Sequence, residues 1–455
     1  MTFPATRNYR SYSAKSSNTV PSHSAKESKL LVFATCAFIF AWYLQLGHRV
    51  GLLGAIRFEF LLGTFLIACA AIRMLNERLP ATPIKKPIMI FWGVLAFYTL
   101  FSYDHSQSWD VFYERVVKFS MLALFFAAFI RTQWALKMAI GAFLLAMMKL
   151  GQEGFVGWLS GSMVWMNQGI PRLHGSTGLY AHPNSFSGMA VGCLPFIYYL
   201  FPVANKLQKL ALASLLVGCV IIIVFTGSRT GYVATGLLIA YFWWEKKGTG
   251  KLKLLAMLAL ITPIAISFLP AEYIGRFESI FTLQEAQGSS AATRIQILKD
   301  AIAVFLSHPW GVGVSAFPSV RMEMFGRIQD THNLYLELLT NLSIPGVIAF
   351  GYFVTVIVRT NKAIQANIVR SADFTDGSSR FVYACSRAVV AFLFARLFLG
   401  MFGMDTYEIY WWFAAGITIS LWRISEDNYQ ASRDSTNRRS AYYLGKRQVT
   451  NTHSL

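Results

Sequence analysis

The sequence contains twelve apolar runs that are long enough to cross a lipid bilayer, and this feature constrains the fold more than any other. A transmembrane helix needs about 20 mainly apolar residues. Because 55% of the residues are hydrophobic and only 14% are charged, the chain is far more apolar than a soluble globular protein. We therefore predict an all-α fold, a polytopic transmembrane helical bundle of about 12 spans. The runs begin near Leu30, Leu52, Pro87, Val111, Ala135, Phe186, Leu210, Gly231, Leu252, Asn333, Phe381 and Ile409, the last being marginal in length.

The net charge of +19 results from 41 basic and 22 acidic side chains. Most basic residues lie in every second break between the apolar runs and in the N-terminal tail, whereas the breaks at 104–110 and 151–185 hold one between them. Cytoplasmic loops of membrane proteins carry an excess of Lys and Arg, so we expect both termini in the cytoplasm. A nucleic-acid partner would require basic residues interleaved with aromatic residues on one surface, so we expect no nucleic-acid partner.

This orientation divides the chain into five predicted parts. Residues 1–29 and 423–455 are expected to be disordered cytoplasmic tails, because both are polar and the first lacks the apolar core of a signal peptide. Residues 30–269 would form about nine spans and residues 333–422 about three. Residues 270–332 would form a long extracytoplasmic loop. The five cysteines lie in apolar runs without a C-x-x-C pair, which indicates small buried hydrophobic residues and no metal site.

The long loop carries more positive charge than an extracytoplasmic segment usually does. Long loops tolerate such charge, but the cations could also be there to bind an anion. The loop contains a predicted helix over 293–306, with Ser290 as possible N-cap and apolar residues on one face, which could lie in the membrane interface. His308-Pro309 would end this helix, and Gly311 and Gly313 would form a turn, since no strand precedes them and no G-K-[ST] follows. The basic residues of the loop are Arg276, Arg294, Lys299, Arg321 and Arg327.

A second candidate anion-binding segment, after the long loop, is Phe225–Gly231, F-T-G-S-R-T-G, where one span ends and the next begins. An arginine so close to two apolar segments is costly unless it has a partner or reaches the interface. Arg229 could therefore bind an anionic substrate, with Ser228 as an additional donor. Snorkelling to the interface or a structural ion pair is the alternative.

The third segment that could take part in catalysis is Asp330-Thr331-His332-Asn333, at the boundary between the long loop and the next span. A histidine can take and return a proton near neutral pH, and Asp330 could orient the His332 ring. Alternatively, Asp330 or Thr331 caps the next helix.

Other polar residues of the extracytoplasmic segments could contact the same anion. Arg276 and Arg294 could neutralise a diphosphate through bidentate bonds, although single loop arginines are more often solvated. His182 and Asn184, in the segment Gly178–Asn184, could contribute further polar contacts. For this pair a capped helix start is the favoured alternative.

The order of these features resembles the O-antigen ligase/polymerase superfamily. The resemblance rests on G-S-R-T-G at 227–231, then a long loop with Arg294 and H-P-W-G-V-G at 308–313, then H-N-L-Y-L at 332–336, and is densest over 178–346. It implies a bacterial inner-membrane glycosyltransferase of the metal-independent, inverting GT-C type, without a cofactor. The implied donor is an undecaprenyl-diphosphate-linked oligosaccharide, and the acceptor is a glycan or lipid A-core, with possible polysaccharide-assembly partners.

The same resemblance implies roles for three residues. Arg229 and Arg294 would hold the diphosphate, and His332 would be the general base for the acceptor hydroxyl. Arg276 and His182 match the functional residues of this family more loosely.

One departure from the ligase branch favours the polymerase branch slightly. In ligases the H-N pair is followed, after nine residues, by G-x-x-G-T. The corresponding stretch here is Ser343-Ile344-Pro345-Gly346-Val347, which lacks the first glycine and the threonine. A ligase and a protein O-glycosylating relative remain alternatives within the family. A lipid-glycan flippase is the alternative from another class, although the chain shows no paired broken helices in two matching halves.

Overall fold

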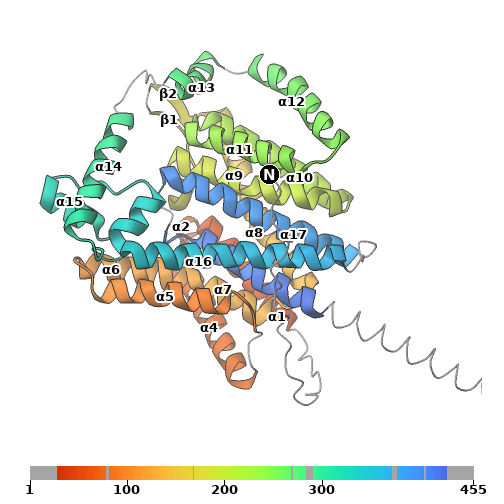
Figure 1. Ribbon diagram of the computed structural model, residues 1–455. Helices are drawn as coiled ribbons and strands as arrows, with labels where there is room; N and C mark the ends of the chain where they lie inside the picture. Colours follow the sequence, from red (N-terminus) through yellow and green to blue (C-terminus); the bar gives the residue numbers. More distant parts are fainter. Residues whose placement is uncertain are drawn as a thin grey trace, which may run out of the picture.

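The computed structural model describes residues 28–77, 81–167, 169–267, 270–282, 290–370, 377–403 and 406–427, and most of these residues are helical (Figure 1). The predicted tails, 1–29 and 423–455, lie almost entirely outside the described residues. The helices, in chain order, are α1 (Lys29–Leu44), α2 (Leu46–Arg49), α3 (Gly51–Ala55), α4 (Phe58–Asn76), α5 (Lys85–Leu100), α6 (His105–Val111), the π-helix η1 (Phe112–Val117), α7 (Lys118–Phe129), α8 (Gln133–Ser160), η2 (Gly178–Tyr180), α9 (Pro183–Leu200), η3 (Phe201–Val203), α10 (Lys206–Phe225), α11 (Arg229–Glu245), α12 (Thr249–Ser267), α13 (Ala271–Thr282), α14 (Ser290–Ser307), α15 (Phe317–Phe325), α16 (Leu334–Arg370), α17 (Gly377–Leu399) and η4 (Gly400–Phe402), followed by a helix at 409–427.

A helix begins within a few residues of each predicted apolar run, but the count of twelve spans is not confirmed. Within the described segments, six helices are long and apolar enough to cross a membrane, namely α4, α8, α9 with η3, α10, α16, and α17 with η4. Other helices, such as α1 and α5 with 16 residues each, are shorter. The run expected near Leu52 starts later, because Arg57 adopts a left-handed conformation (φ 49°) and α4 begins only at Phe58.

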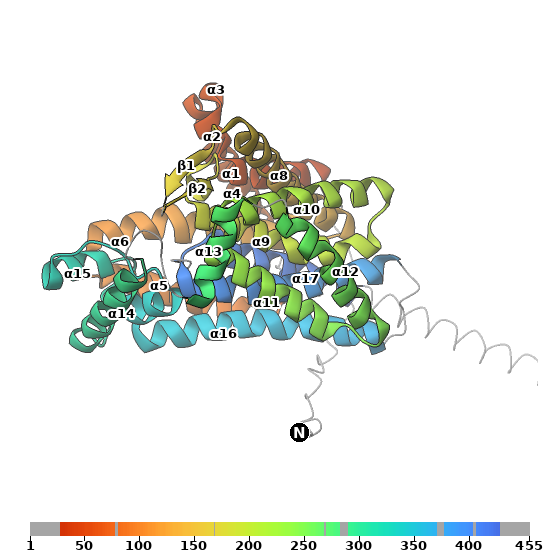
Figure 2. The ribbon, with the colours of Figure 1, turned by 90° about the horizontal axis from the view of Figure 1, so that it is seen from above.

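Helix α9 lies at the centre of the bundle and packs against α17, α10 and α8 (Figure 2). Small residues such as Ser187, Gly188, Ala190 and Gly192 are buried along it, and small residues let helix backbones approach closely within a membrane. Helices α8 and α10 touch at a glycine pair. A Cβ atom added to Gly218 would lie 3.3 Å from the Cα of Gly151.

Helices α13, α14 and α15 lie outside this bundle, near the β-hairpin and the start of α16 (Figures 1 and 2). The predicted helix at 293–306 is confirmed as α14, although Ser290 is its first residue. Gly311 and Gly313 have φ angles of 85° and 109°, which confirms the predicted turn.

Helix α14 is apolar on two faces. Ala301 and Val304 are buried against α15 and the turn that follows α14. Of the predicted apolar face, formed by Ile295, Leu298, Ile302 and Phe305, the first three are 42–56% exposed and Phe305 is partly buried. Contact of this exposed face with the membrane interface stays a prediction.

The all-α prediction missed one hairpin. Strands β1 (Val164–Asn167) and β2 (Ile170–Leu173) pair antiparallel, with Trp165 opposite Arg172. Strands of four residues give too short a pattern to be recognised within a polar segment.

Candidate active site

The Thr226–Gly231 turn between α10 and α11 is built by its small residues. Gly227 has a φ of 56°, and a Cβ atom there would lie 2.6 Å from Cδ1 of Ile170. Ser228 caps α11, since its Oγ accepts a hydrogen bond from the N–H of Gly231 at 3.2 Å. A Cβ atom on Gly231 would clash with the hydroxyl of Ser187. The turn therefore fixes Arg229 as the first residue of α11, where it is partly buried.

Arg172 on β2 holds this turn from the other side. Its side chain is 1% exposed, and its Nε donates to the Thr226 carbonyl at 2.7 Å. The two terminal nitrogens donate to the side-chain oxygens of Asn167 at 3.0 Å and Asn184 at 2.8 Å. One guanidinium group thus connects the hairpin, the turn and the start of α9.

Arg276 reaches the next carbonyl of the turn from α13. The side chain is 8% exposed, and its Nε donates to the carbonyl of Gly227 at 3.3 Å. Tyr273, one turn earlier, donates its hydroxyl to the Pro171 carbonyl at 2.6 Å and packs edge-on against Trp158. Helix α13 is therefore fixed over the turn by both residues.

The three arginines around the turn lie within electrostatic range of one another. The pKa of the Arg172 guanidinium falls to about 10, first because of burial and then because of the positive charges of Arg276 and Arg229. Repulsion of this kind is relieved when an anion binds. The turn is accordingly a concentration of positive charge.

His182 and Asn184 form a capped helix start, as the alternative interpretation of this segment proposed. The Nδ1 atom of His182 accepts a hydrogen bond from the N–H of Asn184 at 3.1 Å. The pKa of His182 is lowered to about 4, first because of burial and then because of the charges of Arg172, His332 and Arg294. The ring is therefore neutral at pH 7, and its Nε2 carries the proton. His182 can donate a hydrogen bond there but is a weak base.

His332 lies in the loop that precedes α16, in a left-handed backbone conformation with φ 47°. Such a conformation is uncommon for a residue other than glycine and often occurs at functional sites. The following residue, Asn333, caps α16, because its Oδ1 accepts hydrogen bonds from the N–H groups of Tyr335 at 2.9 Å and Leu336 at 3.1 Å. The alternative in which Asp330 or Thr331 is the cap is therefore wrong, and the side chain of Asn333 is used structurally.

The protein environment keeps His332 neutral. Desolvation lowers the pKa of its ring, the charge of Asp330 raises it, and the charges of Arg294 and Arg321 lower it again. Burial raises the pKa of Asp330, whose carboxylate accepts the N–H of Thr331 at 2.7 Å. Asp330 therefore acts on His332 through its charge.

Arg294, in the first turns of α14, completes the group of charged residues. Its guanidinium carbon lies 5.6 Å from the ring centre of Phe402, and its charge affects both His332 and His182. The structure thus places Arg294 within electrostatic range of the two histidines, and Arg229 and Arg276 within electrostatic range of Arg172. His182 is coupled to Arg172 and connects the two groups.

Two further arginines of the long loop have structural partners. The carboxylate of Asp300 on α14 accepts hydrogen bonds from Arg321 at 2.8 Å and from Arg327 at 3.0 Å. Arg321 also donates to the carbonyl of Gln329 at 2.9 Å. The helix that carries Arg294 is thereby connected to the loop that carries His332. The part of the chain that the structure describes contains no cluster of His, Cys, Asp and Glu that could hold a metal ion.

Two residues at this site were not among the predicted ones. Arg172 is the single basic residue of the two breaks that are otherwise free of basic residues, and this isolation was the signal that could have revealed it. Trp165, opposite Arg172 in the hairpin, is 40% exposed, and its ring centre lies 6.5 Å from that of His182. Sequence alone could not distinguish this tryptophan from an interfacial one.

Comparison with protein families identifies one match. Residues 212–351 match the family described as O-Antigen ligase, a segment that contains Arg229, Arg276, Arg294 and His332. No curated protein matches the chain significantly. The apolar helices and this domain are those of a multi-pass membrane protein. The chain therefore carries an O-antigen ligase family domain at residues 212–351, which supports its placement in the O-antigen ligase/polymerase superfamily.

Proposed function

We propose that the protein is a glycosyltransferase of the bacterial inner membrane that uses an undecaprenyl-diphosphate-linked oligosaccharide as donor at the periplasmic face. The observation that carries this proposal is a concentration of positive charge. Three arginines surround the Thr226–Gly231 turn, and Arg294 lies within electrostatic range of His182 and His332. Fixed cations in a site of low dielectric stabilise a dianionic leaving group far more than they would in water. Arg229 and Arg294 bind the diphosphate, and Arg276 holds the turn and adds positive charge.

The proposed reaction is a direct displacement with inversion. His332, neutral at pH 7, accepts the proton of the acceptor hydroxyl while its oxygen forms a bond to the anomeric carbon. The bond between the anomeric carbon and the diphosphate oxygen breaks, and undecaprenyl diphosphate leaves with the electron pair. Ser228, Asp330, Asn333, His182 and Asn184 position these groups, and the Nε2–H of His182 can donate to a phosphate oxygen. No metal ion takes part in this proposal.

Within the family we favour a surface polysaccharide polymerase slightly over a ligase that joins glycan to lipid A-core. This preference for a polymerase rests on Ser343 and Val347, which replace a glycine and a threonine of the ligase pattern. Ser343 nevertheless keeps a backbone typical of glycine, with φ 54° and ψ −163°, so this position argues less against a ligase than its side chain suggests. A deletion strain distinguishes the two. Single units on the acceptor indicate a lost polymerase, and finished chains that accumulate on the carrier indicate a lost ligase.

The transferase proposal is tested with purified protein in detergent, supplied with lipid-linked donor and acceptor. Arg229→Ala, Arg294→Ala and His332→Ala should each lower product formation by at least about 100-fold, the usual order for loss of a catalytic group or of transition-state charge stabilisation. Lys299→Ala is the matched control for Arg294→Ala, because Lys299 is an exposed cation on the same helix and should keep full activity.

Normal glycan products from both Arg229→Ala and His332→Ala would refute the mechanism. A flippase, the alternative from another class, would move the lipid-linked glycan across a bilayer but form no glycosidic bond in detergent. New glycosidic bonds formed without a membrane gradient therefore support the transferase and exclude pure transport.

A further inference from the structure

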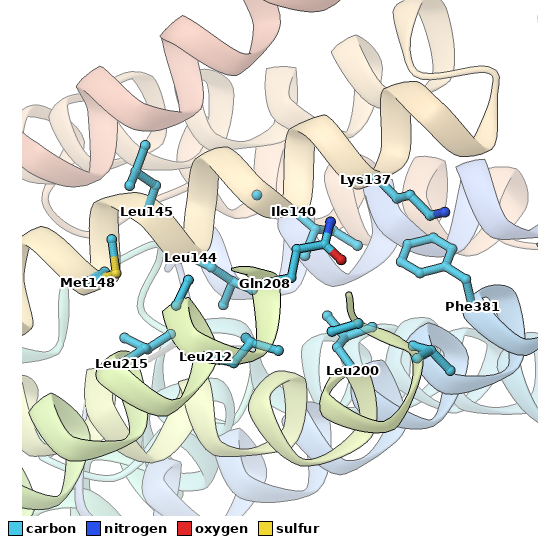
Figure 3. Close-up of a pocket in the computed structure, with 14 residues that line it drawn as sticks. Lys137, Ile140, Leu144, Leu145, Met148, Leu200, Gln208, Leu212, Leu215 and Phe381 are labelled. Atoms are coloured by element: carbon cyan, nitrogen blue, oxygen red, sulfur yellow. The ribbon is translucent and has the colours of Figure 1, made fainter. Parts of the chain in front are cut away.

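A cavity of about 310 Å³ opens between α8, α10 and α17, away from the arginines of the candidate active site (Figure 3). Its walls are apolar, with Ile140 and Leu144 from α8 facing Leu212 and Leu215 from α10. Figure 3 shows Lys137 and Phe381 at one end of the cavity and Met148 with Leu215 at the other.

The glycine contact between α8 and α10 explains the shape of the cavity. The helices touch at Gly151 and Gly218, and Met148 and Leu215 are each three residues before this contact. Leu200 from α9 and Val203 from η3 also line the space between the two helices. Lys137 and Met148 are eleven residues apart on one helix, which corresponds to about 16 Å. This length is about half of the 30 Å hydrocarbon core of a bilayer, so the cavity spans one leaflet.

The polar end of the cavity is positively charged. Lys137 is exposed, and its ammonium group lies 4.9 Å from the ring centre of Phe381. Among the described residues, no carboxylate forms an ion pair with it. Gln208, whose side chain also lines the cavity, supplies an amide in addition to its bond with the N–H of Asn205. A cation at the head-group level above an apolar slot is complementary to an anionic lipid.

We propose that this cavity binds one acyl chain of an anionic phospholipid, with the phosphate of the head group at Lys137. The lipid belongs to the leaflet on the Lys137 side of the bundle, and the site is separate from the one that would hold the lipid-linked glycan. The proposal does not depend on the proposed transferase reaction. Length, apolar walls and charge all favour a membrane phospholipid over a soluble ligand.

Gly141 permits a direct test of the cavity. It lines the cavity, and a Cβ atom added there would meet no atom within 4 Å. Gly141→Leu should therefore fill the slot without a clash. Gly93→Leu on α5 is the matched control, because a Cβ atom there also meets nothing within 4 Å and Gly93 lies outside the cavity. For the head group, Lys137→Gln is compared with Lys86→Gln, an exposed lysine near the start of α5.

The experiment measures binding of phosphatidylglycerol and phosphatidylcholine to the purified full-length protein by native mass spectrometry. We expect the wild type to prefer phosphatidylglycerol. Lys137→Gln should weaken its binding about fivefold, the usual effect of one interfacial cation, and Gly141→Leu should weaken the binding of both lipids about tenfold. The two controls should bind like the wild type.

Each alternative result overturns a defined part of the proposal. Equal binding by Gly141→Leu and Gly93→Leu would show that the cavity does not hold the acyl chain. Equal phosphatidylglycerol binding by Lys137→Gln and Lys86→Gln, or no preference of the wild type between the two lipids, would refute the head-group contact at Lys137. Melting temperatures of all four variants establish that each is folded.

Discussion

At the scale of single residues, the proposed reaction depends on the protonation state of His332. A general base must be neutral before it accepts a proton. Because desolvation and the charges of Arg294 and Arg321 lower the pKa of this ring, His332 remains neutral to a lower pH than an ordinary histidine does. The left-handed backbone at this residue also fixes the direction in which the side chain leaves the loop.

The pH dependence of the reaction follows from this lowered pKa. The decrease in activity on the acid side of the pH profile, where His332 becomes protonated, should be centred below 6.5, the ordinary histidine value. Arg321→Gln removes one of the charges that lower the pKa of His332 and should move the acid-side decrease in activity to higher pH. The measurement is kcat/KM against pH for the wild type and the variant. An acid-side decrease centred at or above pH 6.5 in the wild type would contradict the assignment.

Ser343 supports a prediction about stability. Its φ of 54° and ψ of −163° lie in a region that is essentially restricted to glycine, and its hydroxyl donates to the carbonyl of Pro309. Ser343→Gly should change the free energy of unfolding by less than about 1 kcal/mol, since relief of strain offsets the lost hydrogen bond. Ser343→Val should destabilise by more than about 2 kcal/mol, because a β-branched residue is a genuine outlier at positive φ. Thermal unfolding in detergent measures both, and equal melting temperatures would contradict the argument.

At the scale of helices and strands, the site is assembled by contacts between elements that are distant in the chain. Arg172 connects β2, the start of α9 and the turn before α11, and Arg276 adds α13. On the other side, Asp300 connects α14 to α15 and, through Arg321, to the loop of His332. The arginines and histidines of the site therefore depend on supporting contacts that the family motifs do not contain.

Asp300→Asn tests one of these contacts. Asp300 is 3% and Arg321 1% exposed, and the loss of one partner of a buried ion pair costs about 3–5 kcal/mol. The variant should show faster amide hydrogen exchange in α14 and α15 and lower transferase activity. Glu323→Gln, an exposed carboxylate on α15, is the control and should behave like the wild type.

The pH dependence of stability provides a second measurement for Asp300→Asn. Burial raises the pKa of Asp300, but hydrogen bonds from Gln296, Arg321 and Arg327 outweigh burial and hold the pKa below 3.8. A carboxylate with a lowered pKa stabilises the fold above its ordinary pKa and loses this contribution as the pH falls through the lowered value. The difference in stability between wild type and variant should therefore shrink below about pH 4. A difference that is independent of pH would contradict the ion pair.

At the scale of the whole molecule, the apolar runs made most of the fold predictable. Their positions located the helices, because a bilayer allows few alternatives to helices for an apolar chain. The hairpin was not predictable, because it is too short to have its own pattern. Of the residues that the motifs singled out, Arg294 and His332 lie within electrostatic range of each other, and Arg229 lies in a second group with Arg172 and Arg276. The isolation of Arg172 in segments otherwise free of Lys and Arg could have marked it as unusual, but its hydrogen bonds to Thr226 and Asn184 were not predictable, because no local pattern encodes contacts between distant segments.

The concentration of positive charge predicts how the whole protein responds to salt. Binding of a dianionic donor to several arginines should weaken as ionic strength rises, because salt screens the attraction. We expect the KM for the lipid-linked donor to increase several-fold between 50 and 500 mM salt, with a smaller change in the KM for the acceptor. A donor KM that does not depend on salt would contradict a charge-based donor site.

The pairing of the hairpin has a consequence for how this region can vary. Successive side chains of a strand point to opposite faces, so a one-residue deletion within β2 would turn the position of Arg172 to the other face of the hairpin, away from its present partners. The Thr226 carbonyl, Asn167 and Asn184 would then lose their shared donor at once. Substitutions of the exposed Met166 should be tolerated across related proteins, whereas changes in the length of β2 should be rare.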